Sequence, residues 1–397
     1  MAYTETTNTS YGQRLSGSMK GIVSGLLMFI IGTCLLWWNE GRAVKTSKAI
    51  KEAESVAVHV DDVSTVDASL NGKLIHASAF ADTKDTLADE LFGVRTLAIK
   101  LNRKVEYYQW VEASESETRD KIGGGQETVT TYTYESKWVD KPVKSSGFKD
   151  PEYKSLNFVL TTIEKKDQLA NKVTFGAYTL PEFIKRSISG NVPADVQMTD
   201  EQVREWNKAL HTSVSSVKDS VSLVHSDKNT VYFGQSPNSP RVGDVRITFY
   251  KVMPADISLI AKVNGETFED YKTQNGESFS RVEMGTVSAD NMFQNAQDEN
   301  NMLTWILRIV GLLLVVFGVK SMFSLLPTLF KVLPFLGNIV DAGVGLVCWI
   351  FGLAWSLIVI AIAWLVYRPV IGILLLVAAV AGIIFLKSRS KKTVPQS

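Results

Sequence analysis

Four long apolar runs constrain the possible structure of this chain more than any other feature of its sequence. The first run covers residues 21–38 and contains no charged side chain. At a rise of about 1.5 Å per residue, a helix of this length is close to the hydrocarbon thickness of a bilayer, about 30 Å. The other runs cover residues 303–323, 343–366 and 370–386. The sequence therefore predicts an integral membrane protein with one N-terminal and three C-terminal transmembrane helices.

The residues outside these runs form two tails, one large inserted segment and one short loop. We assign residues 1–20 to an N-terminal tail, residues 45–301 to an inserted domain and residues 387–397 to a basic C-terminal tail. Residues 320–338 are too apolar for a loop in water and contain two prolines. This composition predicts a broken segment that lies along the membrane interface.

The distribution of lysine and arginine predicts the orientation, because cytoplasmic loops carry an excess of these residues. Four basic residues after the first run, beginning with Arg42, favour an outside N-terminus. A larger set favours cytoplasmic termini, since only Arg368 lies in the opposite turn. That set contains Lys320, Lys331, Lys387, Arg389, Lys391 and Lys392. We therefore expect both termini in the cytoplasm and the inserted domain in the periplasm or an organelle lumen.

Strand signals dominate the inserted domain. Three Asn-Gly pairs, at residues 71–72, 264–265 and 275–276, supply the positive φ angles that tight hairpin turns need. β-Branched and aromatic residues predict strands over residues 56–60, 73–80, 95–111, 128–139, 245–252 and 257–263. Residues 113–127 are rich in charges and contain three consecutive glycines, which predicts a mobile hairpin tip.

Two or three helices interrupt these strands, and Pro181 suits the first turn of one of them. Thr199 and Gln202 have the spacing of a capping box at a helix start. From Ala289 onward, apolar residues at helical spacing predict a helix that continues into the second apolar run. The predicted fold class is therefore α+β: four transmembrane helices with a large β-rich, extracytoplasmic or lumenal domain inserted between the first and the second.

One arginine lies inside a predicted membrane helix, where a charge is costly and is a functional candidate by default. This residue is Arg308, and Glu40 lies at a matching depth at the outer end of the first run. We expect an ion pair between the two side chains; the alternative is that Arg308 extends to the lipid headgroups. Asn39, Arg42 and Arg368 lie near the same level. These five residues form a candidate polar cluster in the outer leaflet.

Glycines recur on one face of the first predicted helix. Gly17, Gly21 and Gly25 are spaced by four residues, and Gly32 follows one heptad after Gly25. Such a stripe allows another helix backbone to approach closely. The stripe predicts helix packing, with a second copy of the chain or within the same chain.

The basic C-terminal tail has two interpretations. Lys387, Arg389, Lys391 and Lys392 can bind anionic lipid headgroups, at about 1 kcal/mol per charge near the membrane surface. The alternative is that these residues only set the membrane orientation.

Composition and motif content exclude several functions. With 42 basic and 41 acidic side chains the formal charge is +1, which gives no electrostatic basis for binding nucleic acid. The two cysteines both lie in apolar runs, so we expect no disulfide framework. The four histidines lack a metal-binding spacing, and we find no phosphate loop or nucleophile elbow. The sequence predicts no metal, no cofactor and no enzymatic activity.

Several short motifs occur in a defined order between residues 39 and 369. They are Asn39-Glu40-Gly41-Arg42-Ala43, Leu91-Phe92-Gly93-Val94-Arg95, Tyr108-Gln109-Trp110-Val111-Glu112, Val242-Gly243-Asp244-Val245-Arg246, Trp305 with Arg308 and Gly311, and Trp364 followed by Tyr367-Arg368-Pro369. In these motifs the chain resembles the transmembrane protein 43 (LUMA) family. The resemblance implies one N-terminal span, a lumenal domain and three C-terminal spans. Residues 118–154 and 187–226 carry few motifs, so contacts of the domain do not transfer from the family.

The resemblance also implies a role. Animal members of the family reside in the endoplasmic reticulum and inner nuclear membrane, associate with lamins and emerin, and self-associate; no enzymatic activity is established for them. We therefore expect a scaffold that organises a membrane together with lipids, with further copies of itself and with other membrane proteins. Lamins and emerin are expected partners only if the source of the protein is eukaryotic.

Two alternatives remain from the residues themselves. The first is a lipid-binding or lipid-homeostasis protein, and the weaker one is an oligomeric channel subunit, since the spans lack rings of polar residues. The inserted domain contains no Asn-x-Ser/Thr site and no cysteine. This favours a bacterial inner membrane over the endoplasmic reticulum or inner nuclear membrane.

Overall fold

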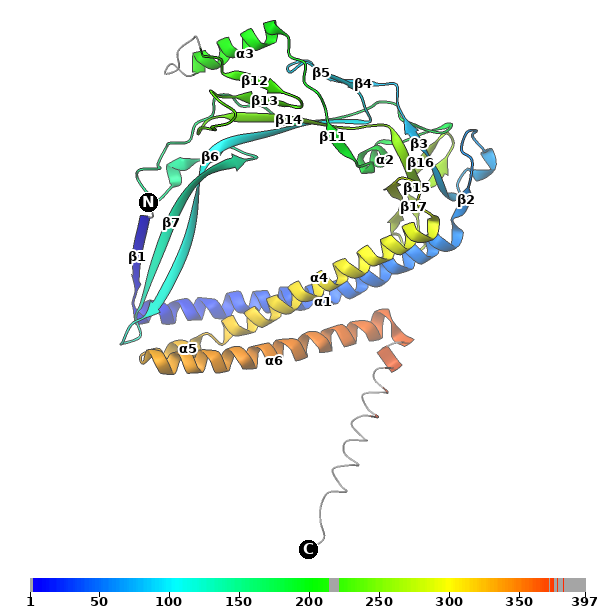
Figure 1. Ribbon diagram of the computed structural model, residues 1–397. Coiled ribbons are helices and arrows are strands. Elements are labelled where there is room, and N and C mark those ends of the chain that lie inside the picture. The colour runs from blue at the N-terminus through cyan, green and yellow to red at the C-terminus, as the bar shows by residue number, and fades with distance from the viewer. Residues whose placement is uncertain (1–2, 214–220, 371, 375–376, 378–380, 382–397) are drawn as a thin grey trace.

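A layer of long helices lies beneath a β-rich domain in the computed structural model of this protein (Figure 1). The structure describes residues 3–213, 221–370, 372–374, 377 and 381. The helices of the layer are α1 (Tyr11–Val56), α4 (Ala289–Met322), α5 (Leu325–Phe330) and α6 (Pro334–Tyr367). Of these, α1, α4 and α6 are long and apolar enough to cross a membrane. The predicted α+β membrane fold is therefore confirmed. Most of the predicted fourth span, residues 370–386, lies outside the described residues.

Helix α1 is longer than the predicted span at both ends. It begins after Ser10, whose side chain accepts a hydrogen bond from the Gln13 backbone while the Gln13 side chain accepts one from the Ser10 backbone. It continues beyond residue 38 because Ala43, Ala49 and Ala53 are buried there. The small alanine side chains allow close packing against α4, and strand β2 (Val58–Val60) starts only after this helix ends.

Helix α4 runs without a break from the domain through the second apolar run, as predicted. The predicted interfacial segment, residues 320–338, contains the end of α4, all of α5 and the start of α6. Pro334 occupies the first turn of α6, a position where the missing N–H costs no helical hydrogen bond. Pro334 thus marks the start of α6, whereas Pro327 lies within the first turn of the short helix α5.

Among the residues that the structure describes, one sheet of the domain contains eight strands. Its main order is β1-β7-β6-β14-β13-β12, with β11 beside β14 and β8 beside β6. The bounds are β1 Tyr3–Thr9, β6 Lys100–Asp120, β7 Gln126–Val139, β8 Lys166–Leu169, β11 Asn191–Pro193, β12 Val224–Asp227, β13 Thr230–Phe233 and β14 Val245–Val252. Strands β6 and β7 form a long antiparallel ribbon, and β1 pairs with the distal half of β7.

The prediction of a mobile tip over residues 113–127 is wrong for most of its length. Strand β6 continues to Asp120, and β7 begins at Gln126. Ser116 and Thr118 pair with Thr130 and Thr128 across the ribbon, so hydroxyl hydrogen bonds support this exposed part of the sheet, which β1 extends on the other side of β7. Only residues 121–125 form the turn, in which two glycines adopt positive φ angles.

The second sheet has the order β19-β15-β16-β10-β9-β3-β2, and β15 also pairs with β3. Its strands are β2, β3 Leu74–Asp82, β9 Thr174–Phe175, β10 Tyr178–Thr179, β15 Ala255–Asn264, β16 Thr267–Glu269 and β19 Arg281–Met284. The described residues also form two small hairpins, β4–β5 (Thr86–Asp89, Val94–Leu97) and β17–β18 (Tyr271–Lys272, Ser278–Phe279). The short helices are α2 (Glu182–Ser187), α3 (Asp200–Ser213) and two 3₁₀ turns (Ala68–Leu70, Ser145–Gly147).

The Asn-Gly pairs divide into two groups. Gly265 and Gly276 have φ angles of +61° and +84° and join β15 to β16 and β17 to β18, as predicted. Gly72 also has a positive φ angle, but it connects a 3₁₀ turn to β3. A dipeptide that supplies a turn therefore does not by itself define a hairpin.

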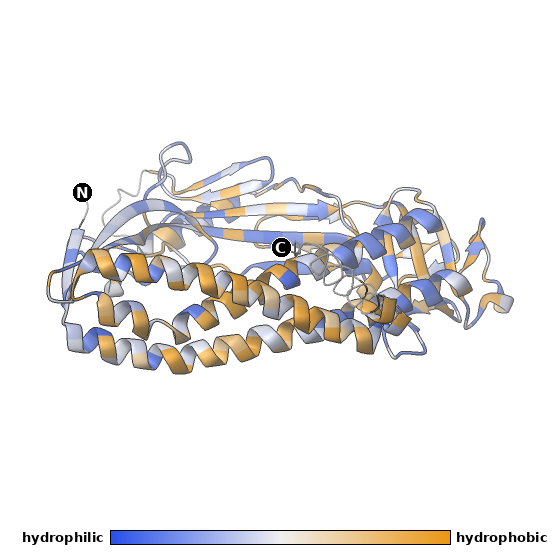
Figure 2. Ribbon diagram, turned by 90° about the horizontal axis from the view of Figure 1, so that it is seen from below, coloured by the Kyte–Doolittle hydropathy of each residue, from blue (hydrophilic) through white to orange (hydrophobic). Residues whose placement is uncertain are grey.

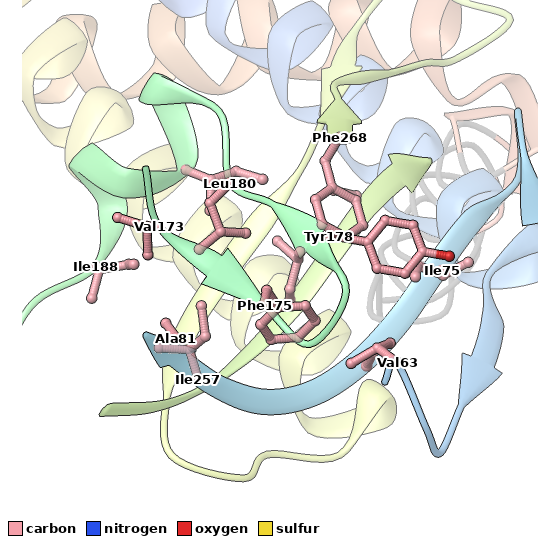
Figure 3. Close-up of a cluster of buried hydrophobic side chains, with 14 of the residues drawn as sticks. Val63, Ile75, Ala81, Val173, Phe175, Tyr178, Leu180, Ile188, Ile257 and Phe268 are labelled. Carbon is pink, nitrogen blue, oxygen red and sulfur yellow. The ribbon is translucent and has the colours of Figure 1, made fainter. Parts of the chain in front are cut away.

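Each sheet has its own hydrophobic core. In the second sheet, Tyr178 and Phe268 pack with their ring centroids 5.2 Å apart, beside Phe175 and Ile257 (Figure 3). In the first sheet, a second cluster gathers around Phe92. Aromatic pairs of this kind add about 0.5–1.5 kcal/mol each beyond the burial of their surface. The two cores therefore stabilise the two sheets of the domain.

A histidine pair lies where the second sheet meets α4. The Nδ1 atoms of His59 and His76 are 2.9 Å apart, and His76 Nε2 lies 2.9 Å from the Val287 carbonyl oxygen. His59 Nε2 also lies 3.0 Å from Asp61. Burial lowers the pKa of His76 below its ordinary 6.5; the nearby His59 lowers it further, and the Val287 carbonyl and Asp290 oppose this.

The lowered pKa of His76 predicts a loss of stability in acid. The folded protein favours neutral His76, whereas the unfolded chain takes up a proton as the pH falls through about 6.5. We expect the unfolding midpoint temperature to be constant above this pH and to decrease between pH 6.5 and pH 5. The slope over that interval should be smaller for His76→Asn. An equal slope for both proteins would show that other groups cause the decrease.

Candidate functional site

The predicted polar residues of α1 and α4 lie together where these two helices are in contact, beside one residue of α6. Asn300, Thr304 and Arg308 recur every four residues on α4 and therefore lie on one face of that helix. We use the name polar cluster for the set Asn39, Glu40, Arg42, Asn300, Thr304, Arg308 and Trp364. Its members come from α1, α4 and α6.

Glu40 is the centre of the polar cluster. Its side chain is completely buried. The carboxylate accepts two hydrogen bonds from Arg308, at 2.6 Å from Nε and 2.9 Å from Nη2. It accepts a third from Trp364 Nε1 at 2.7 Å. The expected Glu40–Arg308 contact is therefore present, in the two-pronged geometry that is strongest for arginine and carboxylate.

Two tryptophans surround the guanidinium group of Arg308. Its central carbon lies 4.9 Å from the ring centroid of Trp305 and 5.8 Å from that of Trp364. An aromatic face attracts a cation, and the attraction increases when water is excluded. Arg308 thus has an anion and two aromatic faces as neighbours. Of the two alternatives for this side chain, the structure shows the ion pair with Glu40 and not the extension to the headgroups.

The other polar residues link α1 to α4 through amide and hydroxyl groups. Asn39 donates to the Thr304 carbonyl oxygen at 3.0 Å, and Asn300 donates to the Ala43 carbonyl oxygen at 3.0 Å. Arg42 donates to the Thr304 hydroxyl at 2.9 Å and to the Asn300 side chain at 3.0 Å. In a nonpolar environment these bonds fix the register of the two helices, because a shift would leave polar groups unpaired.

Arg368 lies at the edge of this arrangement. It caps the C-terminal end of α6, and its guanidinium lies 5.8 Å from the Trp364 ring. It therefore touches the polar cluster through an aromatic side chain and not through Glu40. Asn300, Thr304 and Trp364 were not predicted as members of the cluster. The four-residue spacing of Asn300 and Thr304 with Arg308 is the signal in the sequence that could have identified the first two.

The glycine stripe packs within the chain. An added Cβ would lie 2.6 Å from the Gly318 oxygen at Gly25 and 2.9 Å from the Gly311 oxygen at Gly32. At Gly21 it would lie 3.3 Å from two serine hydroxyls, and at Gly17 it would meet nothing within 4 Å. Gly25 and Gly32 thus allow the backbones of α1 and α4 to touch, and Gly21 makes room for serine side chains. Of the two predicted partners, the helix in the same chain is the one present.

An apolar cavity lies between the helices of the layer. Its volume is 720 Å³. Its lining comes from α1, α4, α5 and α6 and contains Phe29, Val319, Met322, Phe323, Leu326, Gly343, Val344, Val347, Cys348 and Phe351. A cavity of this size and chemistry is suited to hydrocarbon chains.

Two further predictions concern metals and the tail. The part of the chain that the structure describes contains no group of three or more histidine, cysteine, aspartate or glutamate side chains placed to hold a metal. The basic tail residues Lys387, Arg389, Lys391 and Lys392 lie outside the described residues. Their interaction with lipid headgroups stays a prediction.

Comparison with known proteins gives one consistent result. Residues 107–369 match the family described as Transmembrane protein 43. Transmembrane protein 43 of Homo sapiens is 29% identical to this chain over 388 residues, which cover 95% of this chain and 92% of the relative. The Drosophila melanogaster homolog is 30% identical over 372 residues, covering 89% and 90% of the two chains. No solved structure matches this chain.

Proposed function

We propose, on the premise that this chain belongs to the transmembrane protein 43 family, that it is a non-enzymatic membrane scaffold. In this role the helix layer anchors the protein, and the β-rich domain presents a binding surface at the membrane. The partners are membrane lipids, further copies of the chain and other membrane proteins. The membrane is a bacterial inner membrane, or the endoplasmic reticulum and inner nuclear membrane in a eukaryote.

The observation that carries this proposal is the amount of apolar surface that the helix layer leaves uncovered. Helix α6 alone exposes fourteen large apolar side chains. They are Phe335, Leu336, Ile339, Leu346, Val347, Trp349, Ile350, Phe351, Leu353, Leu357, Ile358, Ile362, Leu365 and Val366. Exposed apolar surface of this extent marks contacts with lipid or with other membrane proteins. At the same time the polar cluster holds α1, α4 and α6 in one arrangement, as an anchoring platform requires.

Native mass spectrometry of the full chain, released from nanodiscs of its source lipids, tests the scaffold role. We expect defined oligomers without a selectively retained lipid. A strict monomer would contradict self-association and thereby the scaffold proposal.

The apolar cavity favours one second candidate function, which is lipid binding. A protein with this function would carry one lipid class in fixed stoichiometry in the same spectrum. Val347→Trp would fill the cavity from α6, and Ile350→Trp changes the same helix at a position that does not line the cavity. Loss of the lipid in the first variant alone would support lipid binding, and retention in both would contradict it.

A further inference from the structure

The β-rich domain contacts α1 at both of its ends. Helix α1 contains 46 residues, which places its ends about 69 Å apart at 1.5 Å per residue. At the C-terminal end the chain enters β2, and Ile50 and Ala53 pack with Phe279 and Phe293 of the domain and α4. At the N-terminal end, all seven residues of β1 pair with β7. Figure 1 shows the domain as an arch with one foot on each end of the helix layer.

The distal foot of the arch is the turn of the β6–β7 ribbon. Asp120, the last residue of β6, forms ion pairs with Arg14 of α1 at 2.8 Å and with Lys331 after α5 at 2.9 Å. Arg14 also donates to the Gly124 carbonyl oxygen at 3.0 Å, and the Gly123 N–H donates to the Val332 carbonyl oxygen at 3.1 Å. The ribbon turn therefore lies against both the start of α1 and the segment that follows α4.

The proximal foot holds the opposite end of α4. Arg281 of β19 donates two hydrogen bonds to Glu299 of α4, at 2.7 Å and 3.0 Å. The domain thus binds α4 near its start at this foot, whereas the other foot holds the start of α1 and the residues that follow α5. The segment from α4 through α5 is therefore in contact with the domain at both of its ends, as α1 is.

A ribbon of this composition cannot lie in hydrocarbon. If α1 crossed a bilayer from one side to the other, the β1–β7–β6 ribbon would have to cross beside it. Residues 113–119 of β6 are all exposed and include Glu115, Glu117 and Arg119. Among the described residues β1 forms the edge of the sheet. Charged side chains and an open strand edge are both excluded from the lipid interior.

The helix layer has the complementary surface. Large apolar side chains of α1 remain exposed between residues 22 and 38, namely Ile22, Val23, Leu26, Leu27, Ile30, Ile31 and Trp38. Seen from the side opposite the domain, the layer is largely hydrophobic (Figure 2). Hydrocarbon is the partner that this surface suits, whereas the polar ribbon above it requires water.

We propose that α1 and α4 enter and leave the membrane on the side where the β-rich domain lies, with their apolar surface embedded in the lipid of the adjacent leaflet. Residues 3–9 then share the aqueous compartment of the domain. This placement differs from the predicted orientation, in which residues 1–20 and residues 45–301 lie on opposite sides. It does not depend on the proposed scaffold role.

Cysteine labelling of the full chain in sealed membrane vesicles tests this placement. In a Cys34→Ala, Cys348→Ala background, Thr7→Cys marks β1, and Thr86→Cys marks the domain as a reference; both threonines are exposed. A membrane-impermeant maleimide should label both variants in vesicles of one orientation and neither in vesicles of the other. Labelling of the two sites in opposite orientations would overturn the proposal.

Disulfide cross-linking in the same intact membranes gives a second readout. Thr7 and Thr128 are direct partners in the β1–β7 pairing, as are Thr4 and Thr131. Oxidation should cross-link Thr7→Cys/Thr128→Cys and Thr4→Cys/Thr131→Cys, and should leave Thr7→Cys/Thr86→Cys unlinked. The second pair keeps the test valid if one double variant fails to fold. Failure of both strand pairs to cross-link in folded protein would overturn the proposal.

Discussion

Glu40→Gln is expected to lower the free energy of unfolding by about 3–5 kcal/mol, the typical cost of removing one partner of a buried ion pair. The variant leaves the largely buried Arg308 guanidinium charged and without its anion. It also exchanges a carboxylate that accepts hydrogen bonds from Arg308 and Trp364 for a neutral amide. The change is read from the thermal unfolding midpoint of the purified protein in nanodiscs.

A matched control and a double variant separate this effect from a general loss of charge. Glu54 lies on the same helix but is exposed, so Glu54→Gln should change stability by less than about 0.5 kcal/mol. Glu40→Gln/Arg308→Gln removes both charges and should be more stable than Glu40→Gln alone. The single variant Arg308→Gln completes the comparison. If the losses in unfolding free energy of Glu40→Gln and Arg308→Gln add up to the loss in the double variant, the two side chains do not interact.

Gly25→Leu is expected to separate α1 from α4 and to destabilise the helix layer by about 3 kcal/mol or more, at the upper end of the cost of overpacking. An added Cβ at this position lies 2.6 Å from the Gly318 oxygen and 2.8 Å from the Met322 nitrogen. Both are backbone atoms of α4, so no side chain can rotate to make room. The loss is measured by thermal unfolding and by the fraction of folded protein after extraction.

Gly17→Leu is the control for this substitution. Nothing lies within 4 Å of its added Cβ, and leucine has a higher helix propensity than glycine by about 1 kcal/mol or less. We therefore expect Gly17→Leu to be neutral or slightly stabilising. Equal destabilisation by both variants would contradict the internal packing of the stripe. A change in oligomer size for Gly25→Leu, with unchanged stability, would assign the stripe to self-association.

The two sites differ in how far the sequence predicted them. The Glu40–Arg308 contact followed from the cost of an intramembrane charge and from the depth of the two residues in antiparallel helices. Trp364 was not predicted as the third partner, because its role depends on how α6 packs against the other two helices. The glycine stripe indicated close packing, but a stripe looks the same whether its partner is another chain or α4.

The resemblance to the transmembrane protein 43 family is confirmed. The motif residues on which it rested lie in different structural environments. Glu40 and Arg308 meet in the polar cluster, whereas Val245 lies in strand β14 and Phe92 is the centre of a core cluster. Motifs of one family thus serve packing in one place and ionic contacts in another. The family assignment alone does not distinguish these roles.

By itself, the sequence determined the described apolar helices, the helix that joins the domain to the second run, strands in six segments of the domain, and Glu40 as the candidate partner of Arg308. These features follow from local composition and from the cost of burying charge. Only the tertiary structure decided that residues 3–9 pair with residues 126–132, that the β6–β7 ribbon reaches α1 and α5, and that the glycines face α4. Each of these contacts joins residues more than a hundred positions apart. Periodicity describes only neighbouring residues, so such partners are selected by the packing of the whole chain.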